Sequence, residues 1–207
     1  MSNPWERVHL NDYEEHMKLD DIQQLQILNQ IMKKQIKQNP IKSLAILGIA
    51  GGNGLEYIDL NSFEQVYGID VNQNYLDVCK KRYSHLDKCL TLLKMDLTDL
   101  SNRLPDIELI IGNLLIEYIG IEIFIKQLAK VNPKFVSCVV QKNVTNQFVS
   151  DSPYLEYFME ISGIHNDIDK VELTKGMKSL NYRLILEEEY LLPNGKKFIR
   201  LDYKINE

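Results

Sequence analysis

The apolar residues of this chain recur with two different spacings, and the change between them comes at Pro40. Before it, residues 20–38 carry apolar side chains every three or four positions, which is typical of an amphipathic helix. Asn39 and Pro40 favour the end of that helix. After Pro40, short and nearly continuous apolar runs predict strands that are covered on both faces. The predicted strands span residues 43–48, 65–70, 90–95, 109–112 and 135–141.

Helix-like stretches separate these predicted strands, at residues 54–60, 72–83 and 117–131. Strands that alternate with helices are typical of a parallel sheet with helices on both faces. The C-terminal part differs, because residues 182–192 and 197–205 flank Asn194-Gly195, a strong signal for a β-hairpin. The sequence therefore predicts a doubly wound, Rossmann-like α/β fold, whose mostly parallel seven-stranded sheet ends in a C-terminal antiparallel hairpin.

Length and composition bound the remaining possibilities. The 207 residues can bury one sizeable core, so we expect a single domain over residues 1–207. The net charge of −5 gives no basic footprint for nucleic acid, and no apolar stretch reaches the roughly 18 residues of a membrane span. The N-terminal stretch is polar and acidic, unlike a signal peptide, which indicates a cytoplasmic protein. The cysteines and histidines lack metal-ligand spacing, so we expect reduced thiols and no metal site.

The first predicted strand runs into a glycine-rich turn, LAILGIAGGNGLEYIDL at residues 44–60, where α/β sheets commonly bind ligands. A phosphate loop would continue with Gly-Lys-Ser/Thr, but Leu55 and Glu56 follow Gly54. A dinucleotide-binding turn needs a third small residue at the position that Tyr57 occupies. The spacing that fits is G-x-[GA]-x-G, formed by Gly48, Ala50 and Gly52.

Further polar positions follow the next three predicted strands. Asp70 ends the second strand, where a carboxylate can accept hydrogen bonds from both hydroxyls of a ribose. Asp96 follows the third strand, and Asn113 follows the fourth. Ligands of open α/β sheets bind beyond the carboxyl ends of the strands, so we expect these side chains near the ligand.

In this order, the segments at 44–60, 66–72, 93–100 and 106–119 resemble motifs of the class I S-adenosylmethionine-dependent methyltransferases. The resemblance implies S-adenosylmethionine as the cofactor, with bare backbone along its methionine part, Asp70 at its ribose and Asp96 at its adenine. The sequence departs from the family at Ile46, where an acid usually orients the methionine amino group. The residues that the resemblance assigns to the cofactor are Gly48, Ala50, Gly52, Asp70, Val71, Asp96, Leu97, Asn113 and Leu114.

The N-terminal segment is our candidate to compensate for Ile46. Residues 5–17, with their DYEEHM stretch, resemble the opening of a subgroup of small bacterial methyltransferases of unassigned substrate. In this fold, the segment before the first strand commonly lies over the cofactor. We therefore expect residues 1–38 to form a lid segment and a helix, with Tyr13 and His16 at the cofactor. Residues 150–180 are the candidate substrate cover.

The sulfonium methyl of S-adenosylmethionine is strongly electrophilic, so the protein mainly aligns the acceptor and excludes water. A general base is needed only where the acceptor loses a proton during attack. The Asn-Pro-Pro-Tyr pattern of enzymes that methylate bases is absent after the fourth strand. These features favour a small-molecule acceptor, methylated on oxygen or nitrogen, and predict no nucleic-acid or membrane partner and a monomer or homodimer. The candidate catalytic residues are Glu117, Tyr118 and His165.

Two other classes remain open. An aminopropyl-transfer enzyme would carry additional acids around the loop after the fourth strand. A protein that binds S-adenosylmethionine without turnover, as a sensor or a partner subunit, is consistent with Ile46 in place of the usual acid.

Overall fold

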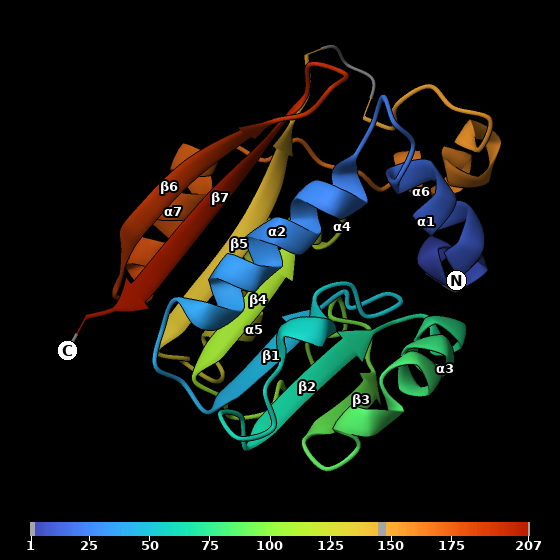
Figure 1. Ribbon diagram of the computed structural model, residues 1–207. Helices are drawn as coiled ribbons and strands as arrows, with labels where there is room; N and C mark the ends of the chain where they lie inside the picture. Colours follow the sequence, from blue (N-terminus) through green and yellow to red (C-terminus); the bar gives the residue numbers. More distant parts are fainter. Residues whose placement is uncertain (1–2, 145–147, 207) are drawn as a thin grey trace.

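The computed structural model describes residues 3–144 and 148–206, and all seven strands in these residues pair into one sheet (Figure 1). The strand order is β3-β2-β1-β4-β5-β7-β6, so the first strand lies near the middle of the sheet. Neighbouring strands are parallel except β7, which is antiparallel to both β5 and β6. The strands are β1 (Ser43–Leu47), β2 (Gln65–Asp70), β3 (Leu90–Lys94), β4 (Leu109–Asn113), β5 (Phe135–Lys142), β6 (Tyr182–Leu191) and β7 (Lys197–Ile205).

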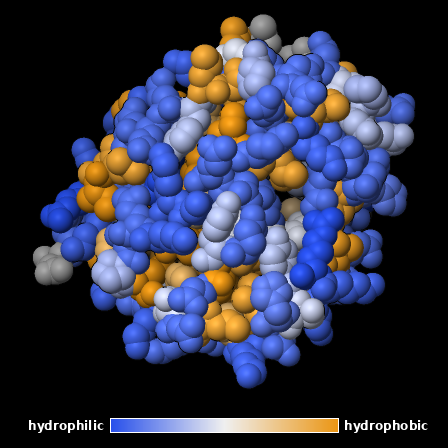
Figure 2. Space-filling view, viewed as in Figure 1, coloured by the Kyte–Doolittle hydropathy of each residue, from blue (hydrophilic) through white to orange (hydrophobic). Residues whose placement is uncertain are grey.

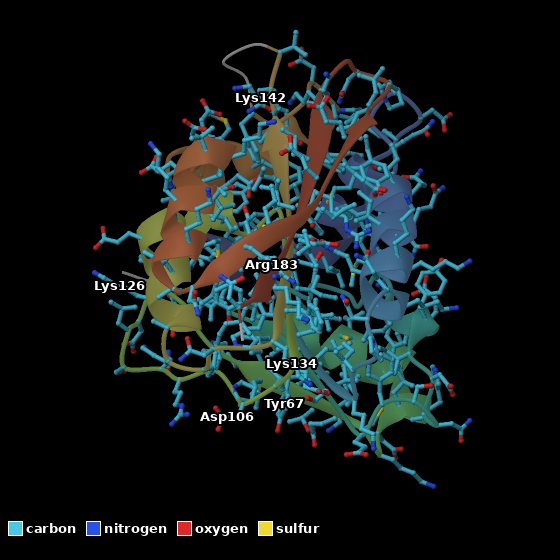
Figure 3. All side chains as sticks on the ribbon, turned by 90° about the vertical axis from the view of Figure 1, so that its left-hand side faces the viewer. Tyr67, Asp106, Lys126, Lys134, Lys142 and Arg183 are labelled. Atoms are coloured by element: carbon cyan, nitrogen blue, oxygen red, sulfur yellow. The ribbon has the colours of Figure 1, made fainter. Side chains whose placement is uncertain are left out.

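This topology confirms the predicted doubly wound α/β fold and its C-terminal antiparallel hairpin. The strand order reverses at β1, where Leu44 pairs with Val66 of β2 on one side and with Leu109 of β4 on the other. Figure 3 looks toward the β6 side of the sheet, where Arg183 lies, and it marks the two ends of β5 by Lys134 and Lys142. Lys142 is at the carboxyl end, and the crevice beside a switch of strand order at this edge is where α/β folds bind ligands.

Alternate side chains of β1 face two different layers of helices. Leu44 and Ile46 belong to a buried cluster with residues of α2 and α3, whereas Ala45 and Leu47 belong to one with α5 and α7. In Figure 1, α2 and α3 accordingly lie in front of the sheet, and α5 and α7 lie behind it. Burial on both faces explains the continuous apolar runs of the inner strands. These helices are α2 (Gln24–Lys37), α3 (Gln73–Arg82), α5 (Ile121–Leu128) and α7 (Lys170–Ser179).

Three predicted helices differ in extent from the structure, and each difference has a backbone cause. The prediction for residues 54–60 is wrong, because only a short 3-10 turn forms at Leu55–Tyr57, after Gly54 with a φ of 92°. The stretch at 117–131 is divided into α4 (Ile116–Ile119) and α5 by Gly120, whose φ is 78°. The N-terminal helix begins at Gln24 rather than near residue 20, because Gln23 is left-handed, with a φ of 51°.

Two segments from distant parts of the chain lie together beyond the carboxyl ends of the strands (Figure 1). Arg7 of the first forms an ion pair with Glu160 of the second, and Val8 packs in one buried cluster with Phe158 and Ile161. The two segments therefore form one continuous cover. They comprise η1 (Pro4–Arg7) and α1 (Leu10–Met17) from the N-terminus, and η4 (Leu155–Phe158) and α6 (Met159–Ser162).

The candidate substrate cover at residues 150–180 is divided by the structure. Its first part, which includes η4 and α6, belongs to the cover described above. Its second part contains α7, whose Leu173 and Met177 are fully buried in the main core beside the sheet. Only the residues before α7 are thus placed to cover a ligand.

The face of the molecule drawn in Figure 2 is largely hydrophilic, with apolar residues in small separate patches. Within residues 3–144 and 148–206, none of the helices is long and apolar enough to cross a membrane. The same described part of the chain contains no group of three or more His, Cys, Asp or Glu residues arranged to hold a metal ion. Cys79, Cys89 and Cys138 are buried free thiols.

The glycine-rich turn after β1 packs closely against helices. A Cβ atom on Gly52 would lie 2.5 Å from the Tyr83 ring and 2.9 Å from Cys79 Sγ. A Cβ atom on Gly54 would lie 2.8 Å from Met32 of α2. These glycines therefore let the turn approach α2 and α3, which fixes the turn at the edge of the sheet.

We predict that Gly52→Ala lowers the free energy of unfolding by about 1 kcal/mol or more beyond the loss in Gly195→Ala. Both glycines have positive φ, 93° and 80°, so both variants incur a backbone cost of roughly 1–2 kcal/mol. Only Gly52 adds a steric clash, because a Cβ on Gly195 would meet Val144 Cγ2 at an ordinary 3.6 Å. Urea unfolding of the two variants measures the difference, and equal losses would show that the packing of this turn is not tight.

Candidate functional site

A cavity opens at the carboxyl ends of the parallel strands, between the sheet and the N-terminal part of the cover. It contains about 720 Å³ of space not filled by protein atoms, which includes the solvent at its mouth. The turn after β1 and the ends of β2, β3 and β4 supply its floor, and the N-terminal segment supplies its roof. Predicted residues that line it are Tyr13, Gly48, Ala50, Asp70, Val71, Asp96, Leu97, Asn113, Leu114 and Tyr118.

Asp70, the last residue of β2, is the acid at the centre of this floor. Its Oδ2 accepts a hydrogen bond of 2.9 Å from the Ala50 N–H, and its Oδ1 accepts one of 2.9 Å from the Asn72 N–H. Burial raises the pKa of Asp70, and these backbone donors oppose that rise. A carboxylate has about four lone-pair sites, so both oxygens can still accept hydrogen bonds from a ligand in the cavity.

The backbone is strained at two places on the cavity wall. Ala50 has a φ of 48° and Leu114 has a φ of 53°, and both residues line the cavity. Non-glycine residues rarely adopt this left-handed region, and such strain clusters at sites where a ligand or a mechanism requires it. At Ala50, this conformation accompanies the hydrogen bond from its N–H to Asp70.

Asp96 lies at the far side of the cavity, just after β3. Its Oδ1 accepts hydrogen bonds from the backbone and the hydroxyl of Thr98, at 2.9 and 2.7 Å. Its Oδ2 accepts one of 3.3 Å from Asn3 Nδ2, so the N-terminal segment reaches across the cavity to this acid. Leu97, the next residue, is buried and lines the same wall.

Ile46, which stands where the family usually has an acid, is buried against the α2 layer. Asn113, a polar side chain that lines the cavity, is the candidate to take the place of that acid. Asn113 and Gln35 of α2 pair their amides reciprocally, with two hydrogen bonds of 2.9 Å. Gln35 is 1% exposed and also donates to Ser137 Oγ at 2.8 Å. These hydrogen bonds therefore hold the Asn113 amide in one orientation at the wall of the first cavity.

Gly52 does not line this cavity, contrary to the expectation that it contacts the cofactor. Its missing Cβ accommodates Tyr83 and Cys79 of the α3 side instead. Of the three positions in the glycine motif, only Gly48 and Ala50 face the cavity. The spacing alone could not separate these roles, because both need a residue without a large side chain.

A second, smaller cavity continues from the first toward the second part of the cover. The two cavities share Trp5, Tyr13, Leu114 and Tyr118 as lining residues, so these four residues form the boundary between them. The Trp5 and Tyr118 rings meet edge to face, with their centroids 4.8 Å apart. Tyr13 stacks against Tyr75 with centroids 6.3 Å apart.

His16 lines the second cavity and not the first, whereas Tyr13, the other N-terminal residue predicted at the cofactor, lines both. Its Nδ1 is 2.7 Å from Ser152 Oγ, which ties α1 to the second part of the cover. Burial, reinforced by the charge of Lys196, lowers the pKa of His16 to about 4. The imidazole is consequently uncharged near pH 7.

Two of the three candidate catalytic residues, Glu117 and His165, do not line either cavity. Glu117 is fully buried, and its Oε1 accepts a hydrogen bond of 2.8 Å from the Gln141 N–H. Burial raises the pKa of Glu117 to about 7, although that hydrogen bond opposes the rise. His165 stacks on Phe148 with centroids 3.5 Å apart, and it lines neither of these two cavities. Among the three candidates, only Tyr118 lines both cavities.

Sequence reasoning missed several residues of the two walls. Tyr75 lines the first cavity from the first turn of α3, and its buried hydroxyl has no hydrogen-bond partner among the described residues. Its position one turn after Asp70 is the signal that could have identified it. Gln24 lines the second cavity, but apolar periodicity marks only the apolar positions of α2.

Comparisons with known proteins agree with this geometry at the level of the fold. No protein-family model matches the sequence. No curated protein matches it either. Solved structures are similar in fold. Magnesium protoporphyrin IX methyltransferase from Synechocystis PCC 6803, with bound S-adenosylhomocysteine, has a TM-score of 0.63 and 10% identity, over 94% of this chain and 87% of that one.

Two further structures show how widely the fold occurs. Geranyl diphosphate C-methyltransferase from Streptomyces coelicolor A3(2) has a TM-score of 0.64 and 10% identity, over 89% of this chain and 81% of that one. The [4+2]-cyclase SpnF has a TM-score of 0.65 and 10% identity, over 89% of this chain and 82% of that one.

The chain therefore has the fold of the class I S-adenosylmethionine-dependent methyltransferases. At these identities the likeness concerns the fold alone, so the residues of the two cavities must carry any statement about activity.

Asn72 connects the roof of the first cavity to its floor. Its Oδ1 accepts hydrogen bonds from the Asn74 and Tyr75 N–H groups and so caps α3. Its Nδ2 donates to the carbonyl oxygens of Trp5 at 2.9 Å and Val8 at 3.3 Å.

We predict that Asn72→Ser loosens the N-terminal segment while α3 stays capped. A serine hydroxyl is a good helix cap but is too short to reach the Trp5 and Val8 carbonyls. Amide hydrogen exchange over residues 5–13 should speed up by about tenfold, whereas exchange in α3 should change little. Unchanged exchange over residues 5–13 would mean that other contacts hold the segment.

Proposed function

We propose that the chain binds S-adenosylmethionine in the first cavity and transfers its methyl group to the oxygen or nitrogen of a small molecule in the second. The observation that carries the proposal is the convergence of a bare βα turn, an acid after β2 and an acid after β3 on one cavity. It is supported by a second cavity that begins where the first one ends.

The residues of the first cavity fit the chemistry of this cofactor. Asp70 offers a buried carboxylate to two neighbouring hydroxyls, and Gly48 and Ala50 offer backbone without bulky side chains. Asp96 offers an acceptor for an amino group, beside the apolar Leu97 and Met95. Asn113, fixed by Gln35, is the group we assign to the methionine end in place of the usual acid.

When bound, S-adenosylmethionine supplies a methyl group that is already strongly electrophilic. The chain then has to align the acceptor and keep water out. Trp5, Tyr13 and Tyr118 stand at the junction of the two cavities and are placed to do both. We assign Tyr118 to the reacting centre. We assign Glu117 a positioning role, because its carboxylate accepts a hydrogen bond from the backbone N–H of Gln141, a residue that lines the second cavity.

The alternative is a protein that binds S-adenosylmethionine without turnover. Ile46 in place of the usual acid favours it, and a [4+2]-cyclase shares the fold. Titration calorimetry with S-adenosylmethionine and S-adenosylhomocysteine, followed by a radiolabelled-methyl screen of metabolite pools, separates the two functions. Binding with transfer supports the methyltransferase, and binding without transfer to any pool supports the alternative.

Asp70→Ala should weaken S-adenosylhomocysteine binding by about 2 kcal/mol, or roughly thirtyfold in Kd, because two ribose hydroxyls lose a charged acceptor. Asp96→Asn is the matched control, since its amide oxygen can still accept a hydrogen bond from an adenine amino group. It should weaken binding much less. Calorimetry measures both, with urea unfolding to show that each variant is folded. Asp70→Ala binding as tightly as the parent would refute the ribose assignment.

The N-terminal segment should behave as a lid over the first cavity. We expect S-adenosylhomocysteine to slow hydrogen exchange across residues 5–17, because a lid is ordered by the ligand it covers. Tyr13→Ala should weaken its binding by about tenfold, whereas His16→Ala, which changes only the second cavity, should leave the Kd within about twofold. Equal losses in both variants would place His16 at the cofactor after all.

A further inference from the structure

The second cavity is lined by aromatic rings and uncharged polar groups. Trp5, Tyr13, Tyr118, Phe148 and Phe158 supply five rings. None of the described residues that line this cavity is an aspartate, glutamate, lysine or arginine. The cavity contains about 460 Å³ of space not filled by protein atoms, which includes the solvent at its mouth.

Two charged groups near this cavity, Lys196 and Glu117, are not among its lining residues. Lys196 is 6% exposed and donates a hydrogen bond to the Phe148 carbonyl oxygen from behind the wall. Glu117 is bonded to the Gln141 N–H. A charged ligand would lose its hydration here without meeting an opposite charge, which is strongly unfavourable.

Three neutral groups on the wall can form a hydrogen bond with a ligand hydroxyl, which both donates and accepts. Gln24 donates its amide N–H to Gln141 Oε1 at 2.5 Å, which leaves Gln24 Oε1 as an acceptor for a ligand. His16 pairs its Nδ1 with Ser152 Oγ, so its Nε2 faces the ligand as an acceptor or a donor according to the tautomer. Ser150 Oγ accepts from Asn194 at 3.0 Å and keeps further lone-pair capacity.

We propose that the acceptor is an uncharged aromatic compound of one or two rings that carries a hydroxyl group, held with the hydroxyl toward Gln24 and His16. The inference rests on the proposed function, and it narrows the acceptor from any small molecule to this class. Rings pack against the aromatic wall, and the hydroxyl satisfies acceptor atoms that an apolar ligand would leave unpaired.

Trp5 provides the measurement, because it is the only tryptophan in the sequence and it lines both cavities. Its fluorescence is followed while four ligands of equal ring size are titrated, with and without saturating S-adenosylhomocysteine. These are p-cresol, toluene, 4-hydroxybenzoate and tyramine. We expect p-cresol to bind at least about tenfold more tightly than each of the other three.

Equal or tighter binding of 4-hydroxybenzoate or tyramine would overturn the inference, and so would equal binding of toluene or no binding of p-cresol. S-adenosylhomocysteine is titrated separately. If it binds and p-cresol shows no preference, the acceptor class is wrong and the proposed function stands. If it does not bind, the proposed function fails whatever p-cresol does.

Variants on one helix assign the hydroxyl contact. Gln24→Leu should weaken p-cresol about tenfold and leave toluene unchanged, because it removes an acceptor and keeps the volume. Gln26→Leu is the matched control, since Gln26 is exposed and donates to the Lys18 carbonyl outside the cavity. If Gln24→Leu does not fold, His16→Phe tests the same preference. An unchanged ratio of p-cresol to toluene in the folded variant would overturn the placement.

Discussion

A buried ion pair in β7, the strand next to the edge strand β6, constrains how the α2 side of this molecule is assembled. Arg200 and Asp202 of β7 are 1% and 3% exposed, and Arg200 Nη2 donates to Asp202 Oδ2 at 2.6 Å. Buried charges are tolerated only when their remaining hydrogen-bonding groups are satisfied. Gln38 accepts from the arginine, and Ser137 of β5 donates to the aspartate. The hydrogen bonds of this ion pair are therefore complete only when three elements are in their native positions: the C-terminal hairpin, β5 and the end of α2.

The same network reaches the first cavity. Ser137 accepts from Gln35, and Gln35 pairs with Asn113 at the end of β4. The orientation of a cavity-lining amide is thus set by a chain of contacts that begins in β7. Polar networks of this kind rigidify a core when every member is satisfied. Through this network α2, which precedes the first strand, orients Asn113 in a cavity whose floor is built from strand ends.

The sequence predicted the strands well because each is a short apolar run that the helices cover on both faces. It also predicted Asp70, Asp96 and Asn113 at one edge, since parallel strands bring their carboxyl ends together. It could not tell Gly48 from Gly52, because the first faces a cavity and the second faces α3 across distances that only the tertiary structure sets. The helix predicted at 54–60 failed for a different reason, because Gly54 has a positive φ and only a short 3-10 turn follows it.

The cover has a consequence for how the two cavities are exposed. Arg7 and Glu160 join its two parts, and Val8 is buried between Phe158 and Ile161. Because this buried cluster joins the two parts, lifting either part away from the sheet would break contacts that also hold the other part. The two cavities therefore share one roof, and the exposure of each depends on the same few apolar contacts.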